Sequence, residues 1–169
     1  LEGAVFALCV KDDITGADGK VILKADTVIE ELATDKEGKL TFTADLPIGF
    51  AYYIKETSPA SGFATTDEIQ EFTFEYEGAE KEKVSYAFTF EDEPTVIEIT
   101  KTSLTDGKEL EGAKLQVTDE SGKVVDSLTS GKEAHIIKEL VVGQKYTLTE
   151  TKPADGFVTA ESITFTVED

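Results

Sequence analysis

Four ionisable side chains fall on strand faces that are otherwise filled by apolar residues. Alternate residues of a strand point to the same face, so a charged residue two places after a core residue lies on the core side. Glu56 follows Ile54 in this way, and Lys101 follows Ile99. An ionisable group among apolar side chains is costly unless it is paired or neutralised. The four positions are Glu56, Asp92, Lys101 and Glu150.

A buried amine beside buried carboxyl groups can do nucleophilic and acid–base chemistry. Burial lowers the pKa of an amine, which frees its lone pair, and raises the pKa of a carboxyl group, which can then be protonated and electrophilic. A second carboxyl can carry protons to and from the attacked carbonyl, and packing holds the groups together. The alternative is that each residue lies just past the end of its strand, where the face no longer matters. Four such residues at equivalent positions fit that alternative less well.

The elements that would position these residues are short β-strands. Apolar and polar residues alternate with a period of two, and glycine turns such as Thr105-Asp106-Gly107 separate the runs. Many short strands with such turns are typical of a β-sandwich or barrel. One stretch differs, because Thr27 to Glu30 resembles a capping box and predicts a short helix over 27–32. The alternating stretches are 40–42, 72–76, 86–90, 97–99, 115–117, 146–148 and 163–167.

The chain contains two copies of one module. Leu1-Glu2-Gly3-Ala4 recurs letter for letter as Leu110-Glu111-Gly112-Ala113, and residues 52–63 match residues 146–157. Glu93-Pro94-Thr95 ends one strand run and begins the next, as proline does at a strand edge or linker. We therefore expect an all-β chain of two tandem immunoglobulin-like β-sandwich modules, at residues 1–94 and 95–169.

These motifs resemble those of the collagen-adhesin B-type and SpaA-type prealbumin-like repeats of Gram-positive surface proteins and pilins. The likeness rests on Leu110-Glu111-Gly112-Ala113-Lys114-Leu115 and on the Tyr-x-x-x-Glu-Thr-x-Pro-Ala-x-Gly-Phe stretches at 52–63 and 146–157. It covers essentially the whole chain. The resemblance implies two prealbumin-like modules.

Repeats of this type often form an intramolecular isopeptide bond. A lysine on the first strand joins an asparagine or aspartate on the last strand, helped by a buried glutamate or aspartate. The resemblance implies that Lys101 is the nucleophile and Glu150 the acid–base residue of the second module. It implies that Glu56 is the acid–base residue and Asp92 the acceptor of the first. Such a cross-link forms once, without substrate or cofactor.

The spacing departs from the family pattern in both modules. Lys101 lies nine residues before Leu110 (110 − 101), so the matching lysine of the first module would precede Leu1. The first strand of that module is expected to be missing. Only 19 residues follow Glu150 (169 − 150), which is room for one strand, so the last strand of the second module is also expected to be missing.

A bond between Lys101 and Asp169 is an alternative. Asp169 shares a face with Val167, but in the repeat it aligns with Tyr76 and not with Asp92. We therefore expect the intact chain to have lost neither water nor ammonia.

Composition and isolated residues point to no metal, cofactor or nucleic-acid chemistry. The formal net charge is −19, from 35 acidic and 16 basic residues, and such a surface repels nucleic acids and anionic membranes. Cys9 is the one cysteine and lies in an apolar stretch, so a buried thiol is expected and no disulfide can form within the chain. His135 has no serine or cysteine motif beside it. The crowded Asp12, Asp13 and Asp18 fit a solvated turn better than a calcium loop.

The sequence favours a structural role and not an enzyme. We expect the extracellular, monomeric stalk of a cell-wall-anchored Gram-positive adhesin or pilin, with its export signal and anchor outside these residues. Neighbouring modules would be its partners, and host extracellular matrix is a further candidate. An alternative is a module that binds a host matrix protein or a glycan through the longer region between Val10 and Lys39. A third hypothesis is an accessory domain of a carbohydrate-active enzyme.

Overall fold

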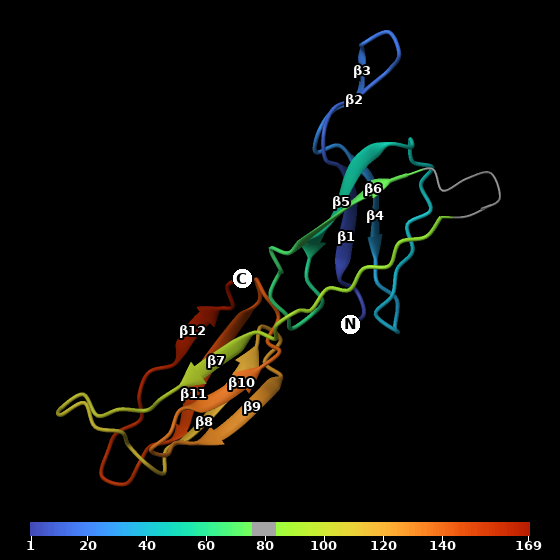
Figure 1. Cartoon of the computed structure of the whole chain (residues 1–169). Helices are drawn as coiled ribbons and strands as arrows, with labels where there is room; N and C mark the ends of the chain where they lie inside the picture. The colour runs from blue at the N-terminus through green and yellow to red at the C-terminus, as the bar shows by residue number, and fades with distance from the viewer. Residues whose placement is uncertain (76–83) are drawn as a thin grey trace. The chain divides into compact units, whose positions relative to one another are not determined.

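The computed structural model describes residues 1–75 and 84–169 and confirms an all-β chain of tandem sandwich modules (Figure 1). By internal contacts it divides into two compact units. The first comprises Leu1–Ser61 and Thr65–Glu93, and the second comprises Gly62–Ala64 and Pro94–Asp169. Within the described ranges no helix is long and apolar enough to cross a membrane.

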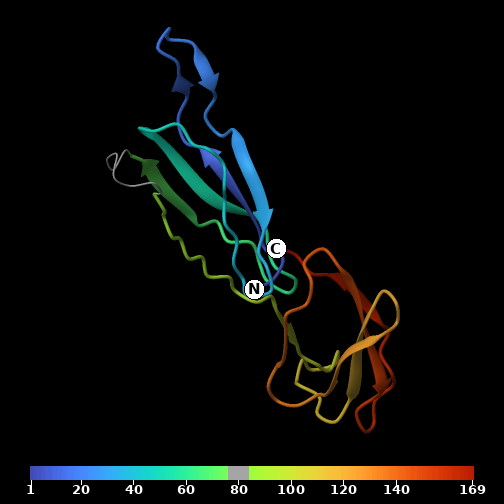
Figure 2. The same ribbon diagram turned by 90° about the vertical axis from the view of Figure 1, so that its right-hand side faces the viewer.

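The first unit is built on a four-stranded antiparallel sheet in the order β4-β1-β5-β6. Its central strand β1 has the sequence VFALCV and is buried over nearly its whole length, as expected of a strand covered on both faces. A separate hairpin, β2–β3, extends beyond the end of this sheet (Figures 1 and 2). The strands are β1 (Val5–Val10), β2 (Ile14–Thr15), β3 (Val21–Leu23), β4 (Val28–Ala33), β5 (Phe50–Ser58) and β6 (Ile69–Phe74).

Aromatic side chains from residues 84–93 cover one face of this sheet. The rings of Phe6 and Phe90 lie 4.9 Å apart, and those of Phe72 and Phe88 lie 5.2 Å apart. The alternation at 86–90 predicted a strand, and that prediction is wrong, because this segment does not join a backbone ladder. Side chains attach it to β6 instead: the amide nitrogen of Gln70 donates to the carbonyl of Thr89 at 2.6 Å. The strand predicted at 40–42 is also absent from the ladders.

The prediction of a helix over 27–32 is also wrong, because Val28–Ala33 form the strand β4. β-branched Val28 and Ile29 favour strands, and the segment pairs antiparallel with β1. Glu30 makes no capping box but accepts hydrogen bonds from the amides of Thr43 (2.8 Å) and Ala44 (2.9 Å). Tertiary pairing thus outweighed a local helix signal.

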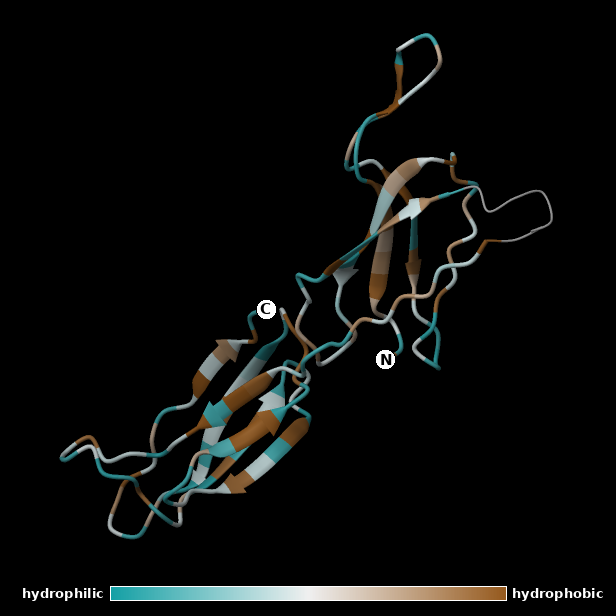
Figure 3. Cartoon of the chain, viewed as in Figure 1, coloured by the Kyte–Doolittle hydropathy of each residue, from teal (hydrophilic) through white to brown (hydrophobic). Residues whose placement is uncertain are grey.

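The second unit is a sandwich of a four-stranded sheet, β12-β11-β8-β9, and a two-stranded sheet, β10-β7. Its core includes Val117 and Tyr146 from the larger sheet and Ile99 and Ile137 from the smaller one. Figure 3 shows the hydrophobic residues concentrated along these strands. The strands are β7 (Val96–Ile99), β8 (Lys114–Asp119), β9 (Val124–Thr129), β10 (His135–Lys138), β11 (Lys145–Lys152) and β12 (Ile163–Thr166).

Candidate functional site

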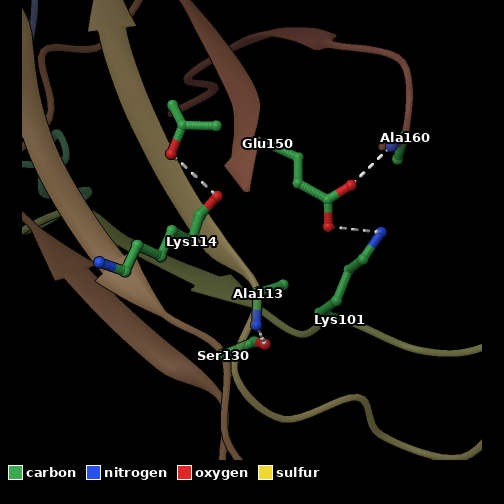
Figure 4. A network of polar contacts seen from close by, with 7 residues as sticks. Lys101, Ala113, Lys114, Ser130, Glu150 and Ala160 are labelled. Atoms are coloured by element: carbon green, nitrogen blue, oxygen red, sulfur yellow. Dashed lines mark hydrogen bonds and ion pairs between the residues drawn. The ribbon is translucent and has the colours of Figure 1, made fainter. Parts of the chain in front are cut away.

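Lys101 and Glu150 form an ion pair in the core of the second unit (Figure 4). Glu150 lies on β11 opposite Leu115 of β8, and directly opposite residues of two strands share a face. Lys101 follows β7 by two residues, so its side chain extends from the other sheet. The distance from Lys101 Nζ to Glu150 Oε1 is 3.3 Å, and the two side chains are 19 % and 2 % exposed.

The second oxygen of the Glu150 carboxylate is held by a backbone amide. The N–H of Ala160 donates to Glu150 Oε2 at 2.5 Å, so the segment before β12 folds back over the strand end (Figure 4). The carboxylate therefore lies between an ammonium group and an amide, which fixes its position. Such a group can accept a proton from the amine on one side without moving.

Glu56 has the same strand position, burial and backbone donor in the first unit. It lies on β5 opposite Phe6 of β1, as Glu150 lies opposite Leu115 of β8. Glu56 is 5 % exposed, and its Oε2 accepts the N–H of Thr66 at 2.8 Å. Thr66 is ten residues after Glu56, just as Ala160 is ten residues after Glu150. The sequence repeat is thus also a repeat in the geometry of a buried carboxylate.

Asp92 lies at the end of the aromatic segment that covers the Glu56 face of the first unit. It follows Phe90, whose ring packs on Phe6, the residue opposite Glu56. Asp92 Oδ1 is buried without a hydrogen-bond partner in the described part of the chain. Burial raises the pKa of the Asp92 carboxyl above its usual value, and the positive amino terminus opposes this more weakly. A carboxyl in this setting is more readily protonated, as an acceptor of a nucleophile must be.

The alternative partner for Lys101, Asp169, lies toward the other end of β11. Thr166 of β12 pairs with Lys145, and Asp169 continues beyond that pair. Glu150 is five residues further along β11, which is roughly 16 Å at the usual rise per strand residue. The register therefore does not direct Asp169 toward the Lys101–Glu150 pair.

The backbone donors of Ala160 and Thr66 were missed by sequence reasoning, because an amide gives no side-chain signal. The repeat helps only once one donor is known, because Thr66 and Ala160 each lie ten residues after the glutamate that they contact. A contact between His135 and Asp126 was missed as well. Nε2 of His135 on β10 lies 2.6 Å from Oδ2 of Asp126 on β9, so it joins the two sheets of the second unit.

The other candidate residues have structural roles. Cys9 is buried beside Ala7 and Tyr53, and burial raises the pKa of its thiol, which is the setting of an unreactive cysteine. Asp13 accepts the N–H of Ala25 at 2.8 Å, so it serves the local turn. Within residues 1–75 and 84–169, no three His, Cys, Asp or Glu side chains are grouped to hold a metal ion.

Each unit has a buried glutamate on its long strand, β5 or β11, opposite a residue of β1 or β8. This shared geometry defines a tandem repeat of one β-sandwich. The chain belongs to the SpaA family, with a prealbumin-like fold domain that matches residues 1–87 and 95–169. The family resemblance read from the sequence is confirmed. No curated protein matches the chain.

Among solved structures, the chain is similar in fold to the Bacillus anthracis TIE protein, with 24 % identity and a TM-score of 0.51. The match covers 100 % of this chain but 29 % of that one. The match to the shaft pilin SpaA from Lactobacillus rhamnosus GG covers 99 % of this chain and 84 % of the pilin chain, at 18 % identity and a TM-score of 0.40. The match to a C-terminal fragment of the pilus adhesin SpaC from the same organism covers 98 % of this chain and 73 % of that fragment, at 17 % identity and a TM-score of 0.45.

Proposed function

We propose that the chain is a structural stalk segment of a Gram-positive cell-surface adhesin or pilin. Family membership and the tandem arrangement support this role, and the observation that carries it is the repeated buried carboxylate. A glutamate at 2 % exposure, paired with a lysine from the opposite sheet, joins the layers of the sandwich at one point. Such a point resists separation of the first strand from the rest of the module. The proposed location is extracellular, with neighbouring modules as partners and a monomeric chain.

The same pair supports isopeptide chemistry. Lys101 Nζ would pass a proton to Glu150, attack the side-chain carbonyl carbon of an aspartate or asparagine, and form an amide. Glu150 would return protons to the leaving group, so that water leaves from aspartate and ammonia from asparagine. In the first unit, Glu56 would serve as the proton carrier and Asp92 as the acceptor. The protein would supply proximity and turn over once, so it would not act as an enzyme on a substrate.

The intact mass of the chain, with tryptic mapping, tests whether such a bond forms within residues 1–169. We expect the mass calculated from the sequence, because the register does not direct Asp169 toward Lys101. A loss of water that maps to a peptide joined through Lys101 would contradict the strand register described above.

The stalk role is tested by labelling intact bacteria. Leu104 is fully exposed in the second unit, so we expect a Leu104→Cys variant of the gene product to react with a membrane-impermeant maleimide on living cells. Buried Cys9 supplies the unreactive background. Labelling that appears only after the cells are broken would exclude a surface stalk.

The β2–β3 hairpin favours a second candidate function, which is binding to a host matrix protein or glycan. Val21 and Ile22 on this hairpin are 45 % and 66 % exposed, and Figure 3 shows hydrophobic colour there. Exposed aliphatic side chains that lie together on a projecting hairpin can form a binding surface for another molecule. If the hairpin binds matrix, an Ile22→Asp variant should lose retention on immobilised matrix protein. A stalk predicts no retention of either form.

A further inference from the structure

Two loops of the same sequence type lie in opposite environments within the second unit. The motif Pro-Ala-x-Gly-Phe ends in Gly62-Phe63 in the first copy and in Gly156-Phe157 in the second. Residues Gly62–Ala64 belong to the second unit by their contacts. Gly62 is buried, whereas Gly156 is exposed. Both glycines have a left-handed backbone, with φ of 89° and 84°.

The Gly62 loop is covered by the beginning of the second unit. The N–H of Thr95 donates to the carbonyl of Gly62 at 3.0 Å, and Phe63 forms an isolated β-bridge with Pro94. A β-carbon on Gly62 would lie 2.8 Å from the carbonyl oxygen of Glu139. The missing side chain is therefore what allows this close approach.

The Gly156 loop has a similar backbone but is open to solvent. Among the described residues, a β-carbon on Gly156 would have no neighbour within 4 Å. Phe157 is 46 % exposed and Val158 is 89 % exposed. A groove of about 350 Å³ opens beside the loop, lined in part by Leu110, Glu111, Asp155 and Phe157.

We propose that residues 156–158 are the docking site for the leading strand of a further module of this type. The occupant is a β-sandwich that begins with a Pro-Thr pair like Pro94-Thr95, and its threonine amide and hydroxyl would donate to the carbonyl of Gly156. Phe157 would pair with the proline, as Phe63 pairs with Pro94. The inference rests on the proposed stalk function. It adds that the Gly-Phe loop of a module binds the leading strand of the module that follows it.

The experiment compares maleimide labelling of a Val158→Cys variant in two settings. The first setting is the purified chain of residues 1–169, and the second is the full gene product on intact bacteria. We expect the Val158→Cys variant to label at least about tenfold more slowly on the cell, because a docked module protects the loop. Leu104→Cys, which lies on another exposed loop, is the matched control and should label at similar rates in both settings.

The outcomes separate the two proposals. Slow labelling of Val158→Cys with fast labelling of Leu104→Cys on the cell supports the docking site. Fast labelling of both variants overturns the docking site and leaves the stalk intact. Absence of labelling of both variants on intact cells overturns the surface stalk, and the docking site with it.

Discussion

Replacing Lys101 with methionine tests whether the Lys101–Glu150 contact behaves as a buried ion pair. Methionine keeps a long apolar side chain and removes the charge. The variant leaves a carboxylate that is 2 % exposed, beside the amide of Ala160, without its cation. We expect the second unit to lose stability at neutral pH.

The magnitude follows from the burial of the two partners. Removing one partner of a buried pair costs about 3–5 kcal/mol, against about 0–1 kcal/mol for a surface pair. Exposures of 19 % and 2 % place Lys101 and Glu150 near the buried case. The loss of stability has an upper limit, because a carboxylate without its cation can take up a proton. A glutamate in an unfolded chain titrates near 4.3, so protonation at pH 7 costs about 3.7 kcal/mol.

We therefore expect Lys101→Met to cost about 3 kcal/mol at pH 7 and about 1 kcal/mol at pH 5, where protonation is cheap. The sign of the pH dependence follows from the unpaired carboxylate. Its free-energy cost is present above the pKa that a glutamate has in the unfolded chain, and it disappears as the pH falls toward that pKa. Urea unfolding followed by circular dichroism at both pH values measures the difference.

The matched control is Lys108→Met, which removes a lysine from an exposed ion pair with Asp106. It should leave the unfolding midpoint unchanged. If Lys101→Met lowered the free energy of unfolding at pH 7 by no more than Lys108→Met does, the Lys101–Glu150 pair would contribute no more to stability than a surface ion pair. Equal losses at pH 5 and pH 7 would refute the argument for an upper limit.

Gly62, Asp92 and Cys9 each give a further testable expectation. Gly62→Ala should destabilise the chain by more than Gly156→Ala in thermal unfolding, since both lose about 1 kcal/mol through the left-handed backbone but only Gly62 lies against Glu139. Asp92→Asn should stabilise the first unit at pH 7, because burial raises the pKa of Asp92 and its ionisation costs stability; the gain should vanish below about pH 3.8, which urea midpoints at two pH values would show. Cys9 should resist maleimide until urea unfolds the first unit, and native labelling would contradict its burial.

The sequence was sufficient for the residues whose pattern repeats. Period-two alternation placed Glu56 and Glu150 on core faces, and the structure finds both buried on strands that pair in the same register. Alternation was not sufficient for backbone pairing. Phe88 and Phe90 alternate because their rings pack on a sheet face, and packing requires no ladder hydrogen bonds. A hydrophobic period therefore predicts a face more safely than it predicts a strand.

Local signals failed where distant residues decided the outcome. The Thr27–Glu30 pattern fits a capping box, but Glu30 finds the amides of Thr43 and Ala44, thirteen and fourteen residues away. The amide of Ala160 similarly completes the setting of Glu150 from ten residues away. Neither contact has a signature in its own neighbourhood. The repeat supplies what one copy cannot. The amide of Thr66 lies ten residues after Glu56, as the amide of Ala160 lies ten residues after Glu150, so the donor found beside one carboxylate predicts the donor beside the other.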